Sequence, residues 1–369
     1  MKFLFLSTHA FLPTTRKTSV HFVSEALAAR GHEVETISVG FSALSYFKKK
    51  NVYRLLAQSQ KNRFVERAPR YRSACYMPPL HAFSSGNAML DVAMAPMFSL
   101  YGNTIPAFMR EAIRRADVVV IESGTAVAFF KAVRRINPAA RTLYFVRDRL
   151  DTVGASAHLQ KIERLSAAQF DHIIVPSRHI AETFGALPQV EIIPQGIDKQ
   201  AFDASTVSPY APGTINAVSV GNMLFDRDAV VAMAKSAPHV TFHLFGEGIP
   251  DDLPENAKVY GERPFSDIIA YIKFAHFGVA PYRLTERELY LIESSLKLRQ
   301  YSYCALPVLA PSLMACAFPN IIGYSLTDET DWAEKINTAA NLPHLPEWKD
   351  GILSWDEIAE RFAQSVDAH

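Results

Sequence analysis

The stretch from 278 to 309 reads GVAPYRLTERELYLIESSLKLRQYSYCALPVL. Its apolar pattern predicts a strand at 277–281, a loop, a helix from about 293 to 303, and a second strand at 306–309. A strand, a helix and another strand in this order form the repeating unit of a parallel α/β sheet. This stretch therefore predicts an α/β fold.

The predicted helix in this stretch begins with residues suited to binding an anion. Glu293, Ser294 and Ser295 stand at its expected start, where backbone N–H groups and capping side chains favour negative charge. Lys297 and Gln300 are three residues apart and so project from one side of the helix. Strands of α/β sheets that lead into such a helix, with a lysine nearby, commonly hold a diphosphate. The sequence predicts a diphosphate site here.

The alternation of apolar strands and helices extends through both halves of the chain, which is typical of parallel sheets covered on both faces. It is interrupted by KQAFDASTVSPYAPGT (199–214), whose prolines, glycine and small polar residues are typical of a linker. We therefore expect two doubly wound, Rossmann-like domains, at 1–200 and 213–350, that face each other across a cleft. A final amphipathic helix in 351–369 is expected to pack back on the first domain.

The composition favours a cytoplasmic protein. With 369 residues, 49% of them hydrophobic, the chain can bury two cores. Its three cysteines show no metal or redox spacing, which indicates a reducing compartment. The start, MKFLFLSTHAFLP, is interpreted as a core strand rather than a signal peptide. No window approaches the ~20 apolar residues of a membrane span.

Charge is unevenly distributed along the chain. Residues 1–150 hold 22 Lys and Arg against 9 Asp and Glu, whereas the remainder has a net charge of −12. The segment 48–72 contains nine basic residues and one acid, and a Met- and Phe-containing stretch (88–109) follows it. A solvated face is one reading of such a segment, and contact with an anionic membrane surface is the other. Because no nucleic-acid-binding module is recognisable, we expect no nucleic-acid partner.

Polar and glycine residues follow the predicted strands of the second domain, where open α/β sheets bind ligands. Gly221 would allow a ligand to approach the backbone closely. Met223 and Tyr282 could provide an apolar slot for a flat base, although such residues are more often core. Asp226 opens a D-x-D pattern that holds a divalent metal in some sugar-transfer enzymes. At a predicted helix start, however, it is more simply a helix cap, so we expect no metal.

In the first domain, Asp148 follows the predicted strand TLYFVR (142–147). A carboxylate at a strand end is well placed to accept a proton from an attacking hydroxyl, and a surface ion pair or helix cap is the alternative. Asp151 competes for the same role, and Glu122 also ends an apolar strand. His9 is an isolated histidine of the kind that is more often structural.

Four blocks of the sequence together resemble one enzyme family. They are VVVIESGTAVAFFKAVRRINPAARTLYFVRD (118–148), AVSVGNMLFD (217–226), YIKFAHFGVAPY (271–282) and ESSLKLRQY (293–301). The chain resembles the xanthan-type, GumK-like glucuronosyltransferases, which are inverting, metal-independent enzymes with the GT-B fold. The resemblance implies transfer of glucuronate from UDP-glucuronate to a polyprenyl-diphosphate-linked oligosaccharide in exopolysaccharide assembly. It also implies peripheral attachment to the cytoplasmic face of the inner membrane, with UDP-sugar as a substrate and no cofactor.

The resemblance assigns roles to individual residues. Asp148 matches the general base, and Asp226 and Asp198 match acidic residues important to activity. The positions around the donor nucleotide correspond to Met223, Tyr282, Ser295, Lys297 and Gln300. The first domain would bind the acceptor and face the membrane, and the second would bind the nucleotide sugar.

Leu296 stands where the family has a methionine, and arginines flank Asp148. These departures leave open a transferase for a neutral UDP-hexose. A non-catalytic membrane-surface module of the same fold is also left open.

Overall fold

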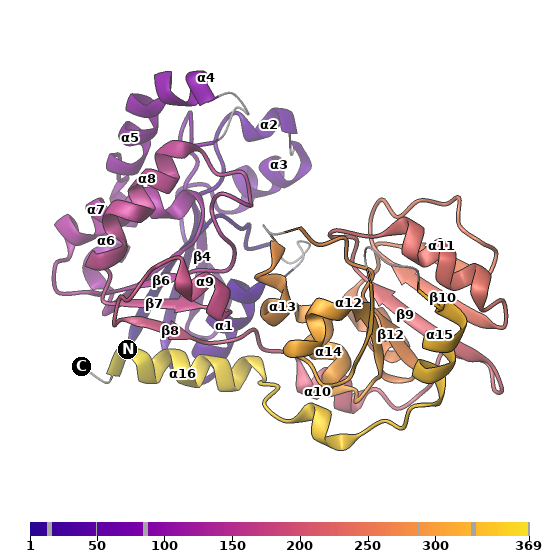
Figure 1. Cartoon of the computed structure of the whole chain (residues 1–369). Coiled ribbons are helices and arrows are strands. Elements are labelled where there is room, and N and C mark those ends of the chain that lie inside the picture. Colours follow the sequence, from indigo (N-terminus) through magenta and orange to yellow (C-terminus); the bar gives the residue numbers. More distant parts are fainter. Residues whose placement is uncertain (13–16, 49, 84–87, 286–287, 326–329, 368–369) are drawn as a thin grey trace. The chain divides into compact units, whose positions relative to one another are not determined.

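The protein is described here by a computed structural model that covers residues 1–12, 17–48, 50–83, 88–285, 288–325 and 330–367. Two compact units make up the chain (Figure 1): Met1–Pro194 with Trp355–His369, and Gln195–Ser354. The first boundary therefore lies before the stretch expected to be a linker. The reason is that α10 (Lys199–Ala204) buries Phe202 in the core of the second unit.

A parallel sheet forms the centre of the first unit. Its strands lie in the order β3-β4-β2-β1-β5-β6-β7-β8, and among the described residues of this unit only the β3–β4 strand pair is antiparallel. The bounds are β1 (Lys2–Ser7), β2 (Glu33–Ser38), β3 (Val65–Ala68), β4 (Tyr71–Cys75), β5 (Val118–Glu122), β6 (Arg141–Phe145), β7 (His172–Val175) and β8 (Val190–Ile192). Strands β3 and β4 lie inside or beside the basic segment 48–72, where the sequence pattern did not predict them. β4 is a strand because it pairs with β2 and buries Tyr71.

Helices cover both faces of this sheet, as the continuous apolar strands predict. They are α1 (Ser19–Ala29), α2 (Ser45–Lys48), α3 (Lys50–Ser59), α4 (Ala88–Ala93), α5 (Ala95–Asn103), α6 (Ala107–Arg115), α7 (Phe130–Ile136), α8 (Ala157–Ser166), α9 (Arg178–Glu182) and α16 (Trp355–Asp367), with 3-10 turns at Thr125–Phe129 and Ala167–Gln169. None of the helices in the described ranges is long and apolar enough to cross a membrane.

The side chains of strand β6 pack against elements on both faces of the first sheet. Successive side chains of a strand point to opposite faces. Phe145 meets Phe362 of α16 edge-on at 4.9 Å, whereas the neighbouring Tyr144 stacks on Phe170 at 4.9 Å. Helix α16 runs beside α1 (Figure 1), where Trp355 stacks on Phe22. The C-terminal helix is therefore part of the first unit.

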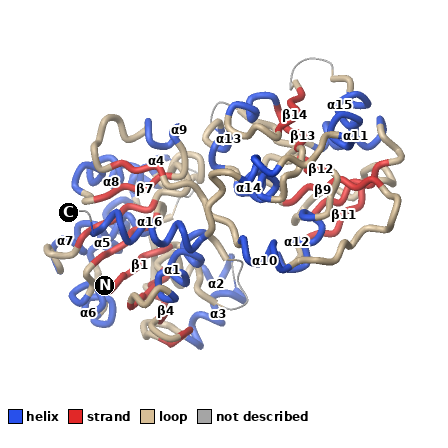
Figure 2. Tube along the Cα trace, turned by 90° about the horizontal axis from the view of Figure 1, so that it is seen from below, coloured by secondary structure: helices blue, strands red, loops and turns tan. Residues whose placement is uncertain are grey.

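The second unit contains a wholly parallel sheet with the strand order β11-β10-β9-β12-β13-β14. Its strands are β9 (Ile215–Val220), β10 (Val240–Phe245), β11 (Ala257–Gly261), β12 (Phe277–Val279), β13 (Val308–Pro311) and β14 (Ile321–Tyr324). Its other helices are α11 (Arg227–Ser236), α12 (Phe265–Lys273), α13 (Leu291–Ser294), α14 (Leu296–Tyr303) and α15 (Trp332–Asn341), with 3-10 turns at Ser312–Cys316 and Pro346–Lys349. Figure 2 shows α11 and α15 on one side of this sheet and α10 and α12 on the other.

Helix α14 is fixed to the sheet through Tyr301. The ring lies over Gly278 of β12, where an added Cβ would stand 2.5 Å from the ring carbon Cδ2. The Tyr301 hydroxyl accepts the N–H of Val220 at 3.1 Å and donates to the carbonyl of Val218 at 3.3 Å. Because both partners lie at the carboxyl end of β9, these bonds set where the start of α14 stands relative to the strand ends.

We predict that Tyr301→Phe lowers the free energy of unfolding by about 1–2 kcal/mol, because it leaves the Val220 N–H without this buried partner. Gly278→Ala should cost about 1–3 kcal/mol through overpacking against the ring. Urea unfolding measures both. Tyr303→Phe is the matched control, because it removes an exposed hydrogen bond to Asp203 from the same helix. A Tyr301→Phe variant as stable as Tyr303→Phe would contradict the role of Tyr301 in fixing α14 to the sheet.

Candidate active site

The carboxyl ends of β1, β5 and β6 are adjacent in the first sheet and bring several polar side chains to one edge. β1 ends at Ser7, β5 ends at Glu122, and Asp148 follows β6 by three residues. The loop after β6 is joined to the end of β5, since the Arg147 N–H donates to Ser123 Oγ at 3.1 Å. Two of the predicted carboxylates, Asp148 and Glu122, are therefore at the same edge of the sheet.

Glu122 is engaged inside the protein. Its Oε2 accepts from Ser7 Oγ at 2.5 Å and from the Thr8 N–H at 3.3 Å, and its Oε1 lies 3.4 Å from His9 Nε2. The side chain is buried, and desolvation raises the pKa of this carboxyl. A carboxylate with these partners holds the loop after β1 in place. Its hydrogen bonds favour a positioning role over proton transfer to a substrate.

Asp148 and Asp151 differ in their surroundings. Asp151 is held by the Arg149 guanidinium through two contacts, at 3.1 and 2.6 Å. Such a bidentate pair occupies both carboxylate oxygens. Asp148 is half-buried, and the Arg147 guanidinium beside it stacks 4.7 Å above the Phe145 ring. The geometry thus disfavours Asp151 as a general base, while the assignment to Asp148 stays a prediction.

His21 is a structural side chain. Its Nδ1 accepts the Thr18 backbone N–H at 3.1 Å, so the proton must reside on Nε2, which donates to the Ala10 carbonyl at 3.0 Å. Burial lowers its pKa to about 4, so the ring is neutral. It caps the start of α1, and its packing fixes the loop that carries His9.

In the second unit, the loop after β9 lies against the segment after β12. The Asp226 N–H donates to the Pro281 carbonyl at 2.7 Å, and Phe225 pairs with Tyr282. Gly221 adopts a φ of +85°, which allows this turn, and Met223 at the tip of the loop is 58% exposed. The predicted residues Gly221, Met223, Asp226 and Tyr282 are therefore brought to one edge of the second sheet.

The D-x-D carboxylates already have structural roles. Asp226 Oδ1 caps α11 by accepting the N–H groups of Asp228 and Ala229 at 3.1 and 3.2 Å. Arg283 contacts both acids, at 2.9 Å from Asp226 and 3.0 Å from Asp228. These contacts agree with the cap interpretation of Asp226. The absence of a metal from the reaction stays a prediction.

The single helix expected from residue 293 is broken at Ser295. Ser294 ends the short helix α13 and donates to the Tyr290 carbonyl at 2.8 Å, so it is not at the start of α14. Ser295 has ψ +111° and caps α14, with its Oγ accepting the Leu298 N–H at 3.3 Å. The same Oγ lies 2.9 Å from Tyr282 Oη. The helix start that favours anions is thus at Ser295, two residues later than predicted.

Lys297 stands in the first turn of α14 with its Nζ 4.7 Å from the centre of the Tyr282 ring. Desolvation lowers the pKa of Lys297 to about 7. In the described part of the chain, no carboxylate compensates this charge. Gln300 lies one turn further along the helix and is buried. A lysine that loses hydration without gaining an anion, at a helix N-terminus, is suited to bind an anionic ligand.

The sequence did not predict every site residue, and one predicted residue, Asp198, has a structural role. Asp198 is exposed and caps α10 by accepting the Ala201 N–H at 3.0 Å. Ser7 and Arg283 were missed, although Ser7 ends the first apolar strand and Arg283 directly follows the predicted site residue Tyr282. That position in the sequence was the available signal.

We predict that Lys297→Met stabilises the protein at pH 7 by about 1–3 kcal/mol, because it removes an uncompensated, desolvated amine. The folded pKa of about 7 lies below the unfolded value of about 10.4. The unfolded state therefore binds more protons between these values, and wild-type stability rises with pH there. Urea unfolding from pH 7 to pH 10 should show a flatter slope for Lys297→Met. The exposed Lys258→Met is the control, and equal slopes for wild type and Lys297→Met would refute the account.

Comparisons with known proteins identify the family. Residues 5–176 match the family model of the glucuronosyltransferase GumK, N-terminal domain. The UDP-glucuronate:glycolipid 2-beta-glucuronosyltransferase of Xanthomonas campestris pv. campestris is 32% identical over 363 residues, which covers 97% of this chain and 88% of the relative.

Solved structures agree in fold. AviGT4, a glycosyltransferase of avilamycin A biosynthesis, superposes with a TM-score of 0.58 at 14% identity, over 99% of this chain and 97% of its own. WaaG, a glycosyltransferase of lipopolysaccharide biosynthesis, has a TM-score of 0.55 at 12% identity, over 98% and 95%. The α/β fold with GT-B neighbours, predicted from the sequence, is thereby confirmed. The chain is a glycosyltransferase and belongs to the GumK glucuronosyltransferase family.

Proposed function

We propose that the protein transfers glucuronate from UDP-glucuronate to a sugar of a polyprenyl-diphosphate-linked oligosaccharide, as a step in exopolysaccharide assembly. The name of the curated relative supports the donor and a glycolipid acceptor. The observation that carries the proposal is Lys297, an uncompensated, desolvated amine in the first turn of a capped helix. Such a site fits the diphosphate of a UDP-sugar.

The donor is held by the second unit. The diphosphate lies at the start of α14, where Lys297 becomes protonated and neutralises the departing UDP. The exposed Met223 flanks the uracil or ribose, and Gln300 adds a polar contact. Tyr282 is buried, as the core interpretation expected, and supports the site through Lys297 and Ser295. A fixed cation does the work that a metal performs elsewhere, so the reaction needs no metal and no cofactor.

The acceptor is held by the first unit. Asp148 takes the proton from the acceptor hydroxyl as its oxygen attacks the anomeric carbon of the sugar. The new C–O bond forms as the bond from that carbon to the UDP oxygen breaks, and the configuration inverts. Glu122 supports this edge through Ser7 and His9.

The first unit also carries a surface suited to a membrane. Phe47, at the end of α2, is 82% exposed, and Met89 and Leu100, on α4 and α5, are 85% and 66% exposed. Lys50 and Arg54 of α3 lie 5.6 and 5.7 Å from the ring centre of Tyr46, next to Phe47. Exposed apolar side chains beside cations favour an anionic lipid surface. We place the enzyme peripherally on the cytoplasmic face of the inner membrane, where the lipid-linked acceptor lies, with no nucleic-acid partner.

For the catalytic role, Asp148→Asn should lower kcat by about 10²–10⁴-fold, because the amide cannot accept the proton. The dissociation constant for UDP should change less than about twofold, since Asp148 lies in the other unit. Asp151→Asn is the matched control and should retain most activity. Transfer from radiolabelled UDP-glucuronate to membrane lipid extract, with UDP-glucose in parallel, gives both rates and donor choice. Full activity in Asp148→Asn would remove this residue from the role, and faster transfer from UDP-glucose would favour the neutral-hexose alternative.

For the membrane surface, replacing Phe47 and Leu100 together by Asp should reduce binding to phosphatidylglycerol-containing vesicles by about fivefold or more. Flotation of vesicles on a density gradient measures the bound fraction. Val207→Asp, an exposed apolar residue of the second unit, is the control and should bind like wild type. Unchanged binding of the double variant would place the lipid contact elsewhere.

A further inference from the structure

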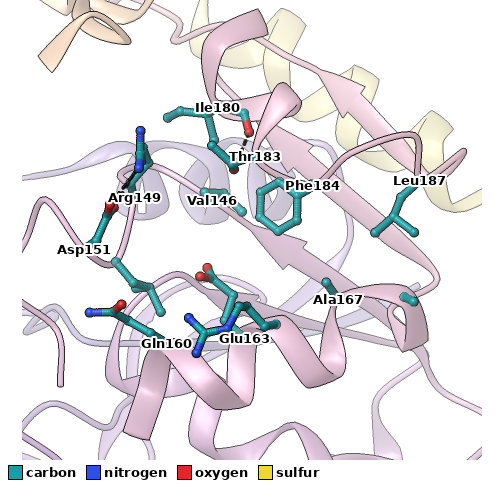
Figure 3. Close-up of a pocket in the computed structure, with 13 residues that line it drawn as sticks. Val146, Arg149, Asp151, Gln160, Glu163, Ala167, Ile180, Thr183, Phe184 and Leu187 are labelled. Atoms are coloured by element: carbon teal, nitrogen blue, oxygen red, sulfur yellow. Dashed lines mark hydrogen bonds and ion pairs between the residues drawn. The ribbon is translucent and has the colours of Figure 1, made fainter. Parts of the chain in front are cut away.

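A pocket of about 430 Å³ opens in the first unit between α8 and α9, above β6 (Figure 3). Its rim includes Arg149 and Asp151, in the loop that begins at the proposed base Asp148. The volume lies within the range of small-molecule sites, about 300–1,000 Å³. None of the residues inside the pocket takes part in the proposed transfer step.

The interior presents hydrogen-bond acceptors. Glu163 points into the pocket (Figure 3), and its Oε1 accepts from the buried Tyr144 hydroxyl at 2.6 Å. That bond fixes the carboxylate and leaves Oε2 toward the pocket. Gln160 donates its amide N–H to the Ala155 carbonyl at 2.9 Å, so its oxygen is oriented as an acceptor. Such groups suit a ligand with several hydroxyl donors.

The charges around the pocket balance. Arg149 and Arg164 contribute two positive charges, and Asp151 and Glu163 contribute two negative charges. Arg149 and Asp151 are also paired with each other. With Glu163 fixed at the centre, an anionic ligand would meet a like charge at close range. The electrostatics therefore favour a ligand without net charge.

The opposite wall is apolar. Val146 and Ile180 form its base, and the Phe184 ring borders the open space (Figure 3). The ring is fixed edge-on against Tyr144, at 6.2 Å between centres. The negative face of an aromatic ring attracts the weakly positive C–H bonds of a pyranose. An apolar wall opposite fixed hydrogen-bond acceptors matches the C–H side and the hydroxyl groups of a sugar ring.

We propose that this pocket is a subsite for a neutral hexose unit of the acceptor glycan, next to the unit that receives the new bond. The identity of the ligand as part of an acceptor rests on the proposed function; the binding of a neutral sugar does not. The chain position supports it, because three of the lining residues, Arg149 to Asp151, follow Asp148 directly. A glycan whose reactive hydroxyl meets Asp148 can therefore extend into the pocket.

The pocket is tested first by direct binding. Saturation-transfer NMR with methyl glucoside, galactoside and mannoside, in the presence of UDP, should give a signal with wild type. Ala168→Trp, which fills the pocket from its exposed lip, should reduce that signal at least about fivefold. Glu163→Gln should act similarly, because it keeps an oxygen for Tyr144 and turns an amide donor toward the sugar. Ala139→Trp is the control for bulk, since Ala139 is exposed and does not line the pocket.

The results decide between the possibilities. Equal signals for wild type and Ala168→Trp would overturn the subsite, provided urea unfolding shows both folded. A stronger signal from methyl glucuronide than from the neutral glycosides would overturn the assignment of ligand charge.

Transfer assays separate this proposal from the proposed function. Synthetic lipid-linked acceptors with one and two neutral hexoses should show a higher kcat/KM for the disaccharide in wild type and in Ala139→Trp. In Ala168→Trp the gain from the second hexose should vanish, while UDP affinity stays constant. A gain that persists in Ala168→Trp counts against the subsite alone. Absence of transfer by wild type to every acceptor counts against the function and leaves the binding result to judge the pocket.

Discussion

The contact between Tyr301 and Gly278 determines where the donor site of the second unit stands. The missing Cβ lets the ring lie directly on β12, and the hydroxyl bridges Val218 and Val220 at the end of β9. Helix α14 is thereby held at a fixed distance from the strand ends. Ser295 can then cap the helix and contact Tyr282 at once. Without this docking, the first turn of α14 would have no defined position relative to the sheet.

The position of Lys297 follows from that docking and bears most directly on function. Placed over the Tyr282 ring, the amine loses water without gaining a carboxylate, which costs folding free energy. Arg283, in contrast, contacts two carboxylates, and Arg149 contacts one. An amine that is left uncompensated at a helix start is suited to bind an anion from outside. In the first unit, Asp148 and the buried Glu122 lie at the same edge of the sheet, where the Arg147 N–H donates to Ser123 Oγ.

Local patterns in the sequence were enough to predict the α/β class and most strands. They also singled out Ser295 and Lys297 at an anion-binding helix start, whereas the roles of Asp148 and Tyr282 came from the family resemblance, and the roles of all four residues stay predictions. Each of these follows a strand or opens a helix, so its position depends on its immediate neighbours. The break at Ser295 could not be predicted, because it depends on the Tyr282 hydroxyl across the sheet edge. The same holds for β4, whose pairing with β2 joins distant segments, and for the two contacts of Arg283. Interactions across such sequence distances leave no periodic signal.

The central claim is that Lys297 binds the diphosphate of the donor. Calorimetric titration of UDP at pH 8, in buffers of different ionisation enthalpy, measures protons taken up on binding. Since the pKa of the free enzyme's Lys297 is about 7, most molecules start with a neutral amine, and the diphosphate should bring in about one proton. Lys297→Met should bind UDP at least about tenfold more weakly and without this uptake. Equal affinity in the two proteins, with no proton uptake by wild type, would contradict the account.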